Sequence, residues 1–256
     1  MTPAGLARQA RLQGHLTLRQ FQIRYRRSLL GWLWAFVQPL SRLAILSFVF
    51  TQVIPLGIEN YPAFLFTGIV AWSWFSSGLI SANSAPMHLR HLLLQPSVHR
   101  FALPVVSVAS DTLDFLAALL LLLVFTTLTA GGPGLALWFL PVIMVVQFIL
   151  IAGLGALLST AHVYVRDIQR VVEVALALGF YITPVFYSPD QIPAGLRWVV
   201  HVNPMAHIIS AYRTVFLEGR LPDLYRFGGV AAGCAAIAAV GFYVFERSSR
   251  TFVDEL

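Results

Sequence analysis

Residues 18–50 read LRQFQIRYRRSLLGWLWAFVQPLSRLAILSFVF, and this stretch decides the fold class. Its first part has no acidic residue and carries four arginines, Arg19, Arg24, Arg26 and Arg27. A long apolar run follows directly. Positive charge next to a membrane-spanning helix is retained on the cytoplasmic side. The pattern therefore predicts an integral membrane protein whose N-terminal segment lies in the cytoplasm.

The composition of the whole chain supports a membrane protein. Of its 256 residues, 58% are hydrophobic and only 11% are charged, and the mean hydropathy is +0.76. A soluble domain of this size needs more polar surface. All basic residues are arginines, and they flank apolar runs rather than forming a separate patch. The net charge of +6 therefore indicates contact with anionic lipid headgroups and not with nucleic acid.

Six segments reach the roughly 20 apolar residues that a spanning helix needs: 33–54, 62–84, 104–130, 135–161, 168–186 and 227–245. With both termini in the cytoplasm, twelve arginines lie inside and four outside. This bias favours that topology over its reverse. The chain is predicted to be one all-α transmembrane domain, 1–256, in four parts: a cytoplasmic segment 1–32, five spans within 33–186, an outer segment 187–226, and the last span with its tail, 227–256.

The outer segment is unusual because residues 196–217 are apolar enough to enter a membrane yet contain several polar side chains. Polar or irregular backbone at membrane depth needs protein or water around it. We predict short re-entrant or interfacial helices over 189–217, broken at Pro204. A single amphipathic helix on the outer leaflet is the alternative.

No pattern in the sequence indicates catalysis. Without any lysine, the chain cannot supply the phosphate-binding lysine of a P-loop. It also lacks the zinc-binding H-E-x-x-H and C-x-x-C spacings and the G-x-S-x-G of serine hydrolases. We therefore expect no enzyme activity, no metal site and no cofactor in this chain.

Three separated stretches carry a family resemblance. Residues 24–39 read RYRRSLLGWLWAFVQP, residues 165–168 read VRDI, and residues 183–187 read TPVFY. Pro193, the Asn-Pro-Met at 203–205 and Arg213 follow. In this order the chain resembles the permeases of type 2 ABC exporters for polysaccharides, the O-antigen, capsule and teichoic-acid group.

The resemblance implies a homodimeric permease in the bacterial inner membrane. Each subunit would have an N-terminal cytoplasmic interface helix, six spans, and re-entrant gate helices between spans five and six. Two copies of a separate ATP-binding protein would bind ATP and magnesium, and a lipid-linked glycan would be the substrate. The outer gate would include Pro189, Pro193, Asn203, Pro204 and Arg213.

The ATP-binding subunit is expected to dock on the basic cytoplasmic surfaces, because force passes to the spans through them. These surfaces contain Arg19, Arg24, Arg26, Arg27, His91, Arg100, Arg166 and Asp167. The sequence departs from the family pattern in two places. Arg42 lies in the first span, where the family more often has a neutral residue, and the loop 88–100 lacks the usual Lys-x-x-x-Phe-Pro motif.

Aromatic residues near the membrane midplane are candidates for a glycan path, because sugar rings pack on flat apolar faces. The predicted lining comprises Trp72, Trp74, Phe75, Tyr181, Phe186 and Tyr187. Tryptophan more often lies at the membrane interface. Helix packing, favoured by the neighbouring serines, is the alternative for the second span.

Three charged residues lie within predicted spans, namely Arg42, Asp111 and Asp114. A charge in the membrane costs about 2.5–3.5 kcal/mol on insertion scales, so such residues pair or face water. We expect Arg42 to pair with an aspartate; a role in substrate binding or coupling is the alternative. Glu173 is expected to pair locally with Arg170.

Two other functions remain open. One is a drug or lipid exporter of the same fold, and the other is an ion-coupled secondary transporter that uses Arg42, Asp111 and Asp114.

Overall fold

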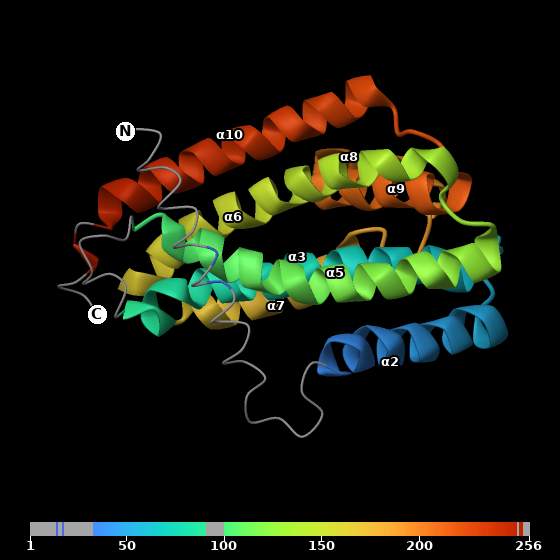
Figure 1. Cartoon of the computed structure of the whole chain (residues 1–256), viewed down its shortest axis with the longest axis horizontal. Helices are drawn as coiled ribbons and strands as arrows, with labels where there is room; N and C mark the ends of the chain where they lie inside the picture. The colour runs from blue at the N-terminus through green and yellow to red at the C-terminus, as the bar shows by residue number, and fades with distance from the viewer. Residues whose placement is uncertain (1–13, 15–16, 18–32, 91–99, 250, 253–256) are drawn as a thin grey trace.

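A computed structural model describes residues 14, 17, 33–90, 100–249 and 251–252, and all regular elements within them are helical. Figure 1 shows the long helices lying side by side along one axis. The main helices are α2 (Trp34–Phe48), continued by the π-helical turn η2 (Val49–Val53), α3 (Tyr61–His88), α5 (Ala102–Ala130), η3 (Gly134–Phe139) leading into α6 (Leu140–Tyr164), α7 (Ile168–Ile182), α9 (Pro204–Glu218) and α10 (Leu224–Ser248).

In the part of the chain that the structure describes, five helical segments are long and apolar enough to cross a membrane: 36–53, α3, α5, η3 with α6, and α10. The predicted span 168–186 is shorter than expected, because α7 ends at Ile182 after 15 residues. At 1.5 Å per residue it covers about 22 Å of a hydrocarbon core about 30 Å thick. The helix stops at Thr183, which is extended (ψ 139°) because a residue before proline avoids the helical conformation.

Helix α3 forms the centre of the bundle. Most of its side chains are buried, with Leu65, Phe66 and Ile69 fully so. Its sequence is apolar on all sides, which is typical of a helix surrounded by others rather than facing lipid along one face. Helix α2 packs at the edge, and Ile45 and Phe48 remain exposed. The core therefore lies between α3, α5 and α6.

Helix α6 lies between α3 and α10 and touches both through small residues. A β-carbon on Gly155 would lie 2.4 Å from the β-carbon of Ala82 in α3. On the other side, a β-carbon on Gly241 of α10 would lie 2.1 Å from the carbonyl oxygen of Gly153. Small residues permit such close approach of membrane helices, where dispersion contacts replace the hydrophobic effect.

Helices α6 and α10 run in the same direction. Phe139, just before α6, packs on Phe227 near the start of α10, with ring centroids 5.7 Å apart. At the other end of the pair, the ring centroids of Tyr164 and Phe252 lie 6.4 Å apart. The chain between the two helices must therefore return along the length of the bundle, and α7 provides most of this return (Figure 1).

The predicted break at Pro204 is confirmed. Residues 189–202 form the single turns η4 (Pro189–Gln191) and η5 (Ala194–Leu196) and the short α8 (Arg197–Val202), and α9 begins at Pro204. Asn203 is extended, and its side chain accepts a hydrogen bond from the backbone N–H of Met205. An asparagine cap followed by proline at the first helical position is a strong start signal.

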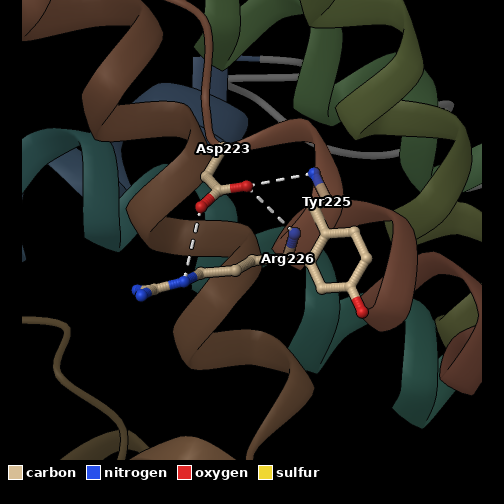
Figure 2. A network of polar contacts seen from close by, with 3 residues as sticks. All are labelled: Asp223, Tyr225 and Arg226. Atoms are coloured by element: carbon tan, nitrogen blue, oxygen red, sulfur yellow. Dashed lines mark hydrogen bonds and ion pairs between the residues drawn. The ribbon is translucent and has the colours of Figure 1, made fainter.

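A carboxylate caps the N-terminus of α10 in the same way. Figure 2 shows Asp223 accepting backbone hydrogen bonds from Tyr225 (3.0 Å) and Arg226 (3.1 Å). Its second oxygen lies 3.4 Å from Nε of Arg226. The ion pair is exposed and contributes little, about 0–1 kcal/mol, whereas the cap satisfies two N–H groups that have no partner within the helix. The cap sets the start of the last span three residues earlier than predicted.

Candidate functional site

Arg213 joins three separate parts of the chain, namely α9, the start of α3 and the residues that follow α7. It lies on the buried face of α9, with only 7% of its surface exposed. Its Nη1 donates to the carbonyl of Pro184 (2.8 Å), and its Nη2 donates to that of Val185 (2.6 Å). Its Nε donates to Phe64 in α3 (3.4 Å), and the guanidinium carbon lies 3.4 Å from the centre of that residue's ring.

These hydrogen bonds give partners to buried backbone carbonyl groups that lie outside a helix. Residues 183–185 leave the α7 helix, so their carbonyl groups lose helical partners while Thr183 to Val185 remain buried. An unpaired buried carbonyl is costly, and more so at membrane depth. A guanidinium donates several hydrogen bonds in a fixed plane and packs on an aromatic face. Arg213 therefore holds the irregular segment in place.

Three further contacts hold the same junction, which consists of the start of α3, residues 183–187 and α9. Gly68 leaves the necessary space, because a β-carbon there would lie 2.6 Å from the carbonyl oxygen of Val185. The Tyr61 hydroxyl donates to the carbonyl of Phe186 (2.9 Å). The Asn203 amide donates to the hydroxyl of Thr183 (2.8 Å). We call this group of contacts the outer clamp.

The predicted gate residues are thus only partly brought together. Asn203, Pro204 and Arg213 belong to the clamp or adjoin it. Pro189 lies in η4, which is tied to the loop before α3 by a hydrogen bond from Gln191 to the carbonyl of Leu56 (3.0 Å). Pro193 is exposed, just before η5.

A groove of about 450 Å³ lies between α2, α3 and α7. Its walls are mostly apolar and aromatic, and its polar groups are few. The lining residues are Arg42, Ile45 and Leu46 from α2, Trp72, Ser76 and Ile80 from α3, and Glu173, Leu176, Ala177, Phe180 and Tyr181 from α7. Such a surface, with few polar groups among apolar walls, is typical of a site for an organic ligand.

Aromatic rings continue from the groove to the outer segment. Trp72 packs edge-on against Phe180, with ring centroids 6.1 Å apart, and Phe180 stacks on Phe186 at 5.9 Å. Phe186 in turn contacts Tyr187 at 5.0 Å and stacks on Phe50 of η2 at 5.4 Å. We call this series the aromatic ladder. It connects the groove with the residues that follow α7.

The family follows from comparison with known proteins. A family model described as ABC-2 type transporter matches residues 13–217. The chain belongs to the ABC-2 type transporter family. The matched region includes every helix from α2 to α9 and therefore both the groove and the outer clamp.

Relatives of this ABC-2 family member include named export proteins. It is 30% identical over 246 residues to the O-antigen export system permease protein RfbA of Klebsiella pneumoniae, covering 94% of this chain and 93% of that protein. The protein of the same name from Myxococcus xanthus is 30% identical over 243 residues, with 94% of each covered. The polysialic acid transport protein KpsM of Escherichia coli is 23% identical over 218 residues, covering 81% of this chain and 82% of that protein.

Of the predicted path residues in this ABC-2 protein, Trp74 does not reach the groove. Its ring stacks on Phe115 of α5 with centroids 4.1 Å apart, and it is 2% exposed. Two positions along a helix differ in direction by about 200°. Trp72 and Trp74 therefore face nearly opposite sides of α3, and only Trp72 is turned to the groove. Phe75 packs on Trp72 at 5.3 Å, and Tyr181 lines the groove.

The predicted pairing of Arg42 with an aspartate was wrong for the described part of the ABC-2 chain, where no ion pair joins them. Arg42 is exposed on α2 and lines the groove, whereas Asp111 is buried in α5 and Asp114 is half-buried there. Glu173, on the opposite wall from Arg42, accepts a hydrogen bond from Gln169 (2.8 Å), and no ion pair with Arg170 forms. Sequence analysis missed Gln169 as the partner of Glu173, although the i, i+4 spacing on a helix is a local signal for such a pair.

The expected contacts with an ATP-binding subunit lie only partly within the described residues. Arg19, Arg24, Arg26, Arg27 and His91 lie outside them, together with most of the expected interface helix. Arg166 and Asp167 are exposed in the turn between α6 and α7. Arg100 donates to the carbonyl of Ser249 at the end of α10 (2.6 Å), so it also stabilises that helix end. Within the described part, no group of three or more histidine, cysteine, aspartate and glutamate residues is placed to bind a metal ion.

Proposed function

We propose that this chain is the permease subunit of an ATP-driven exporter, which carries a lipid-linked polysaccharide of the O-antigen type from the cytoplasm across the bacterial inner membrane. Similarity over nearly the whole chain to O-antigen export permeases carries the proposal. The groove and the aromatic ladder agree with it, because they offer flat faces for sugar rings.

Energy comes from a separate subunit in this proposal. Two copies of an ATP-binding protein supply ATP and magnesium, dock on the basic cytoplasmic surfaces, and move the spans, while the permease itself catalyses no reaction. Arg166 and Asp167 are the docking residues within the described part, since both are exposed in the turn between α6 and α7. An ion-coupled carrier is disfavoured, because Arg42 is not assembled with Asp111 and Asp114 into one site.

The path lies at the interface of two identical permeases. The groove opens next to exposed apolar residues of α7, including Val174 and Leu178. Two copies related by a two-fold axis present the same surface to each other and double its aromatic lining. A single bundle with a closely packed core offers little room for a hydrated glycan.

The topology in this proposal has six crossings with both termini in the cytoplasm. The parallel arrangement of α6 and α10 supports it, because the chain between them must return across the membrane. The return combines α7, which is too short to span alone, with residues 183–187 held by the outer clamp. In this scheme η4, η5, α8 and α9 lie on or re-enter the outer leaflet and form the exit gate.

Cysteine labelling tests the topology. In a Cys234→Ala background, cysteines at Ser188 or Ser210 are expected to react with a membrane-impermeant maleimide added to the outside of intact spheroplasts. A cysteine at Arg166 is expected to react only after permeabilisation. Exposure of Ser210 and Arg166 makes both positions suitable. Labelling at position 166 in intact spheroplasts would contradict the topology. So would a lack of labelling at both position 188 and position 210.

Export assays on the two tryptophans test the function. In cells that lack the native gene, the wild-type chain with its ATP-binding partner is expected to restore surface O-polysaccharide. Trp72→Ala should slow export per assembled complex about three- to tenfold, because one aromatic contact contributes about 0.5–1.5 kcal/mol. Because Trp72 is itself only 5% exposed, this variant should also be less stable. Trp74→Ala should destabilise the bundle by about 3–5 kcal/mol, as large-to-small core changes do, without slowing export per assembled complex.

The export rate is measured by surface immunodetection of the glycan, and assembly by co-purification of the ATP-binding partner. Normal export in Trp72→Ala would show that the groove is not on the path. Failure of the wild-type chain to restore any surface glycan, despite normal assembly, would reject the proposed substrate class.

A further inference from the structure

A chain of hydrogen bonds connects the inner ends of three helices with the groove. Asn83 of α3 is fully buried, and its Nδ2 donates to Oε1 of Gln169 in α7 (2.6 Å). Gln169 Nε2 donates to Oε1 of Glu173 one turn later (2.8 Å). The Nδ1 of buried His162 in α6 lies 3.1 Å from the backbone oxygen of Asn83. We call Asn83, Gln169 and Glu173 the amide chain.

The order of donors and acceptors gives the amide chain a direction. Gln169 accepts through its oxygen from Asn83 and donates through its nitrogen to Glu173. The Oδ1 of Asn83, at the start of the chain, is buried without a hydrogen-bond partner among the described residues. The last acceptor is the carboxylate of Glu173. Breaking the bond between Asn83 and Gln169 would leave the buried Asn83 amide without that partner, which costs about 1–3 kcal/mol, so Gln169 is held in place. The bond from Gln169 to Glu173 is exposed and contributes less, about 0.2–0.5 kcal/mol, but it favours one rotamer of the Glu173 side chain on the groove side.

The groove thus presents one positioned carboxylate, one guanidinium and aromatic rings. Glu173 and Arg42 come from different helices, α7 and α2, and Trp72 of α3 lines the same groove. A charged side chain within a membrane-spanning bundle is retained where it has polar partners. An acyl chain would offer no hydrogen-bonding group to either charge. A phosphate group would be attracted by Arg42 but opposed by Glu173, and an ammonium group would meet the reverse.

A neutral sugar ring matches all of these groups together. Its hydroxyls donate to a carboxylate and accept from a guanidinium, and its C–H face packs on a tryptophan ring. We propose that Glu173 is a specificity-determining residue that accepts hydroxyl hydrogen bonds from a pyranose ring of the exported glycan, with Asn83 and Gln169 as the positioning residues of its carboxylate. The inference rests on the proposed function and deepens it.

The test uses the full-length chain co-purified with its ATP-binding partner in nanodiscs of phosphatidylglycerol, so that no zwitterionic lipid headgroup can occupy the groove. The probe is the lipid-linked O-polysaccharide extracted from the membranes of cells that express the chain. ATP hydrolysis is measured against probe concentration. This measurement separates the maximal stimulated rate from the probe concentration that gives half of the stimulation.

Glu173→Gln keeps the size of the side chain but removes its charge and one acceptor oxygen. It is expected to raise the half-stimulating concentration about tenfold. Gln169→Met has similar length and cannot donate, so it should raise that concentration about threefold by releasing the carboxylate. Glu173→Asp keeps the carboxylate and should fall between wild type and Glu173→Gln. The matched control is Glu218→Gln, an exposed glutamate of α9 paired with Arg220 outside the groove, which should behave as wild type.

The possible outcomes separate the role of Glu173 from the proposed function of the chain. If wild-type hydrolysis is stimulated and the two main variants keep its half-stimulating concentration, the role of Glu173 is overturned while the proposed function stands. If they lower only the maximal rate, the amide chain is structural and the inference is again overturned. If the probe does not stimulate the wild-type complex at all, the proposed function itself fails.

Discussion

Replacing Arg213 by glutamine is expected to abolish export and to destabilise the protein by about 3–5 kcal/mol, as removal of one partner from a buried charged network does. Glutamine cannot serve the carbonyls of Phe64, Pro184 and Val185 together, and it loses the contact with the Phe64 ring. The segment after α7 then has buried carbonyls without donors. This segment links α7 to the outer helices and carries Phe186 and Tyr187 of the aromatic ladder. When the segment is no longer held, these two rings lose their positions.

Arg213→Lys separates charge from geometry. An ammonium keeps the positive charge but has neither the planar fork nor the flat face that packs on Phe64. We expect it to recover less than half of the lost stability. Thermal unfolding in detergent and surface glycan in cells measure the two effects. Arg197→Gln is the control, because Arg197 is exposed and makes one hydrogen bond, to the carbonyl of Ile192 (3.2 Å). A wild-type melting temperature for Arg213→Gln would reject the outer clamp.

Gly241→Ala is expected to cost about 3 kcal/mol, the upper end for overpacking a core, although it adds a single methyl group. The new β-carbon would lie 2.1 Å from the carbonyl oxygen of Gly153 and 2.9 Å from its carbonyl carbon. Both atoms are backbone, so no side chain can rotate away and α6 and α10 must separate. Since their parallel packing places the last span, we expect export to fall as well.

The same helix provides the control for this substitution. Gly233 also lies in α10, and a β-carbon there would have no other heavy atom within 4 Å. Gly233→Ala should stay within about 1 kcal/mol of wild type, because only helix propensity changes. The free energy of unfolding of both variants, measured in the same detergent, tests whether α6 and α10 are in backbone contact at Gly241. Equal stability of the two would show that α6 and α10 are not in backbone contact.

Much of the fold could be predicted from sequence because its signals are local. The length of an apolar run limits where a helix can span, and proline and glycine mark the breaks. Thus the predicted 104–130 agrees with α5 at Ala102–Ala130, and the break at Pro204 was correct. The fifth span was too long by four residues, because apolar side chains continue past Thr183 although Pro184 has already ended the helix.

The candidate site depended on partners that are distant in the chain. Arg213 meets Phe64 across 149 positions, and Asn83 meets Gln169 across 86. No local pattern reports such contacts. Helical geometry alone shows that Trp72 and Trp74 point apart, but only the position of α7 and α5 shows which of them faces the groove.

Local patterns in the sequence were enough to predict a helical membrane protein, the approximate positions of its helices, the break at Pro204 and the family that it resembles. These properties depend on burial in lipid and on backbone conformation, which act residue by residue. The packing of the helices was needed to place Arg42 and Glu173 on the walls of one groove and to find the carbonyl partners of Arg213. What a charged side chain does within a membrane depends on its hydrogen-bond or ion-pair partner, and the folded arrangement of the helices determines which partner it meets.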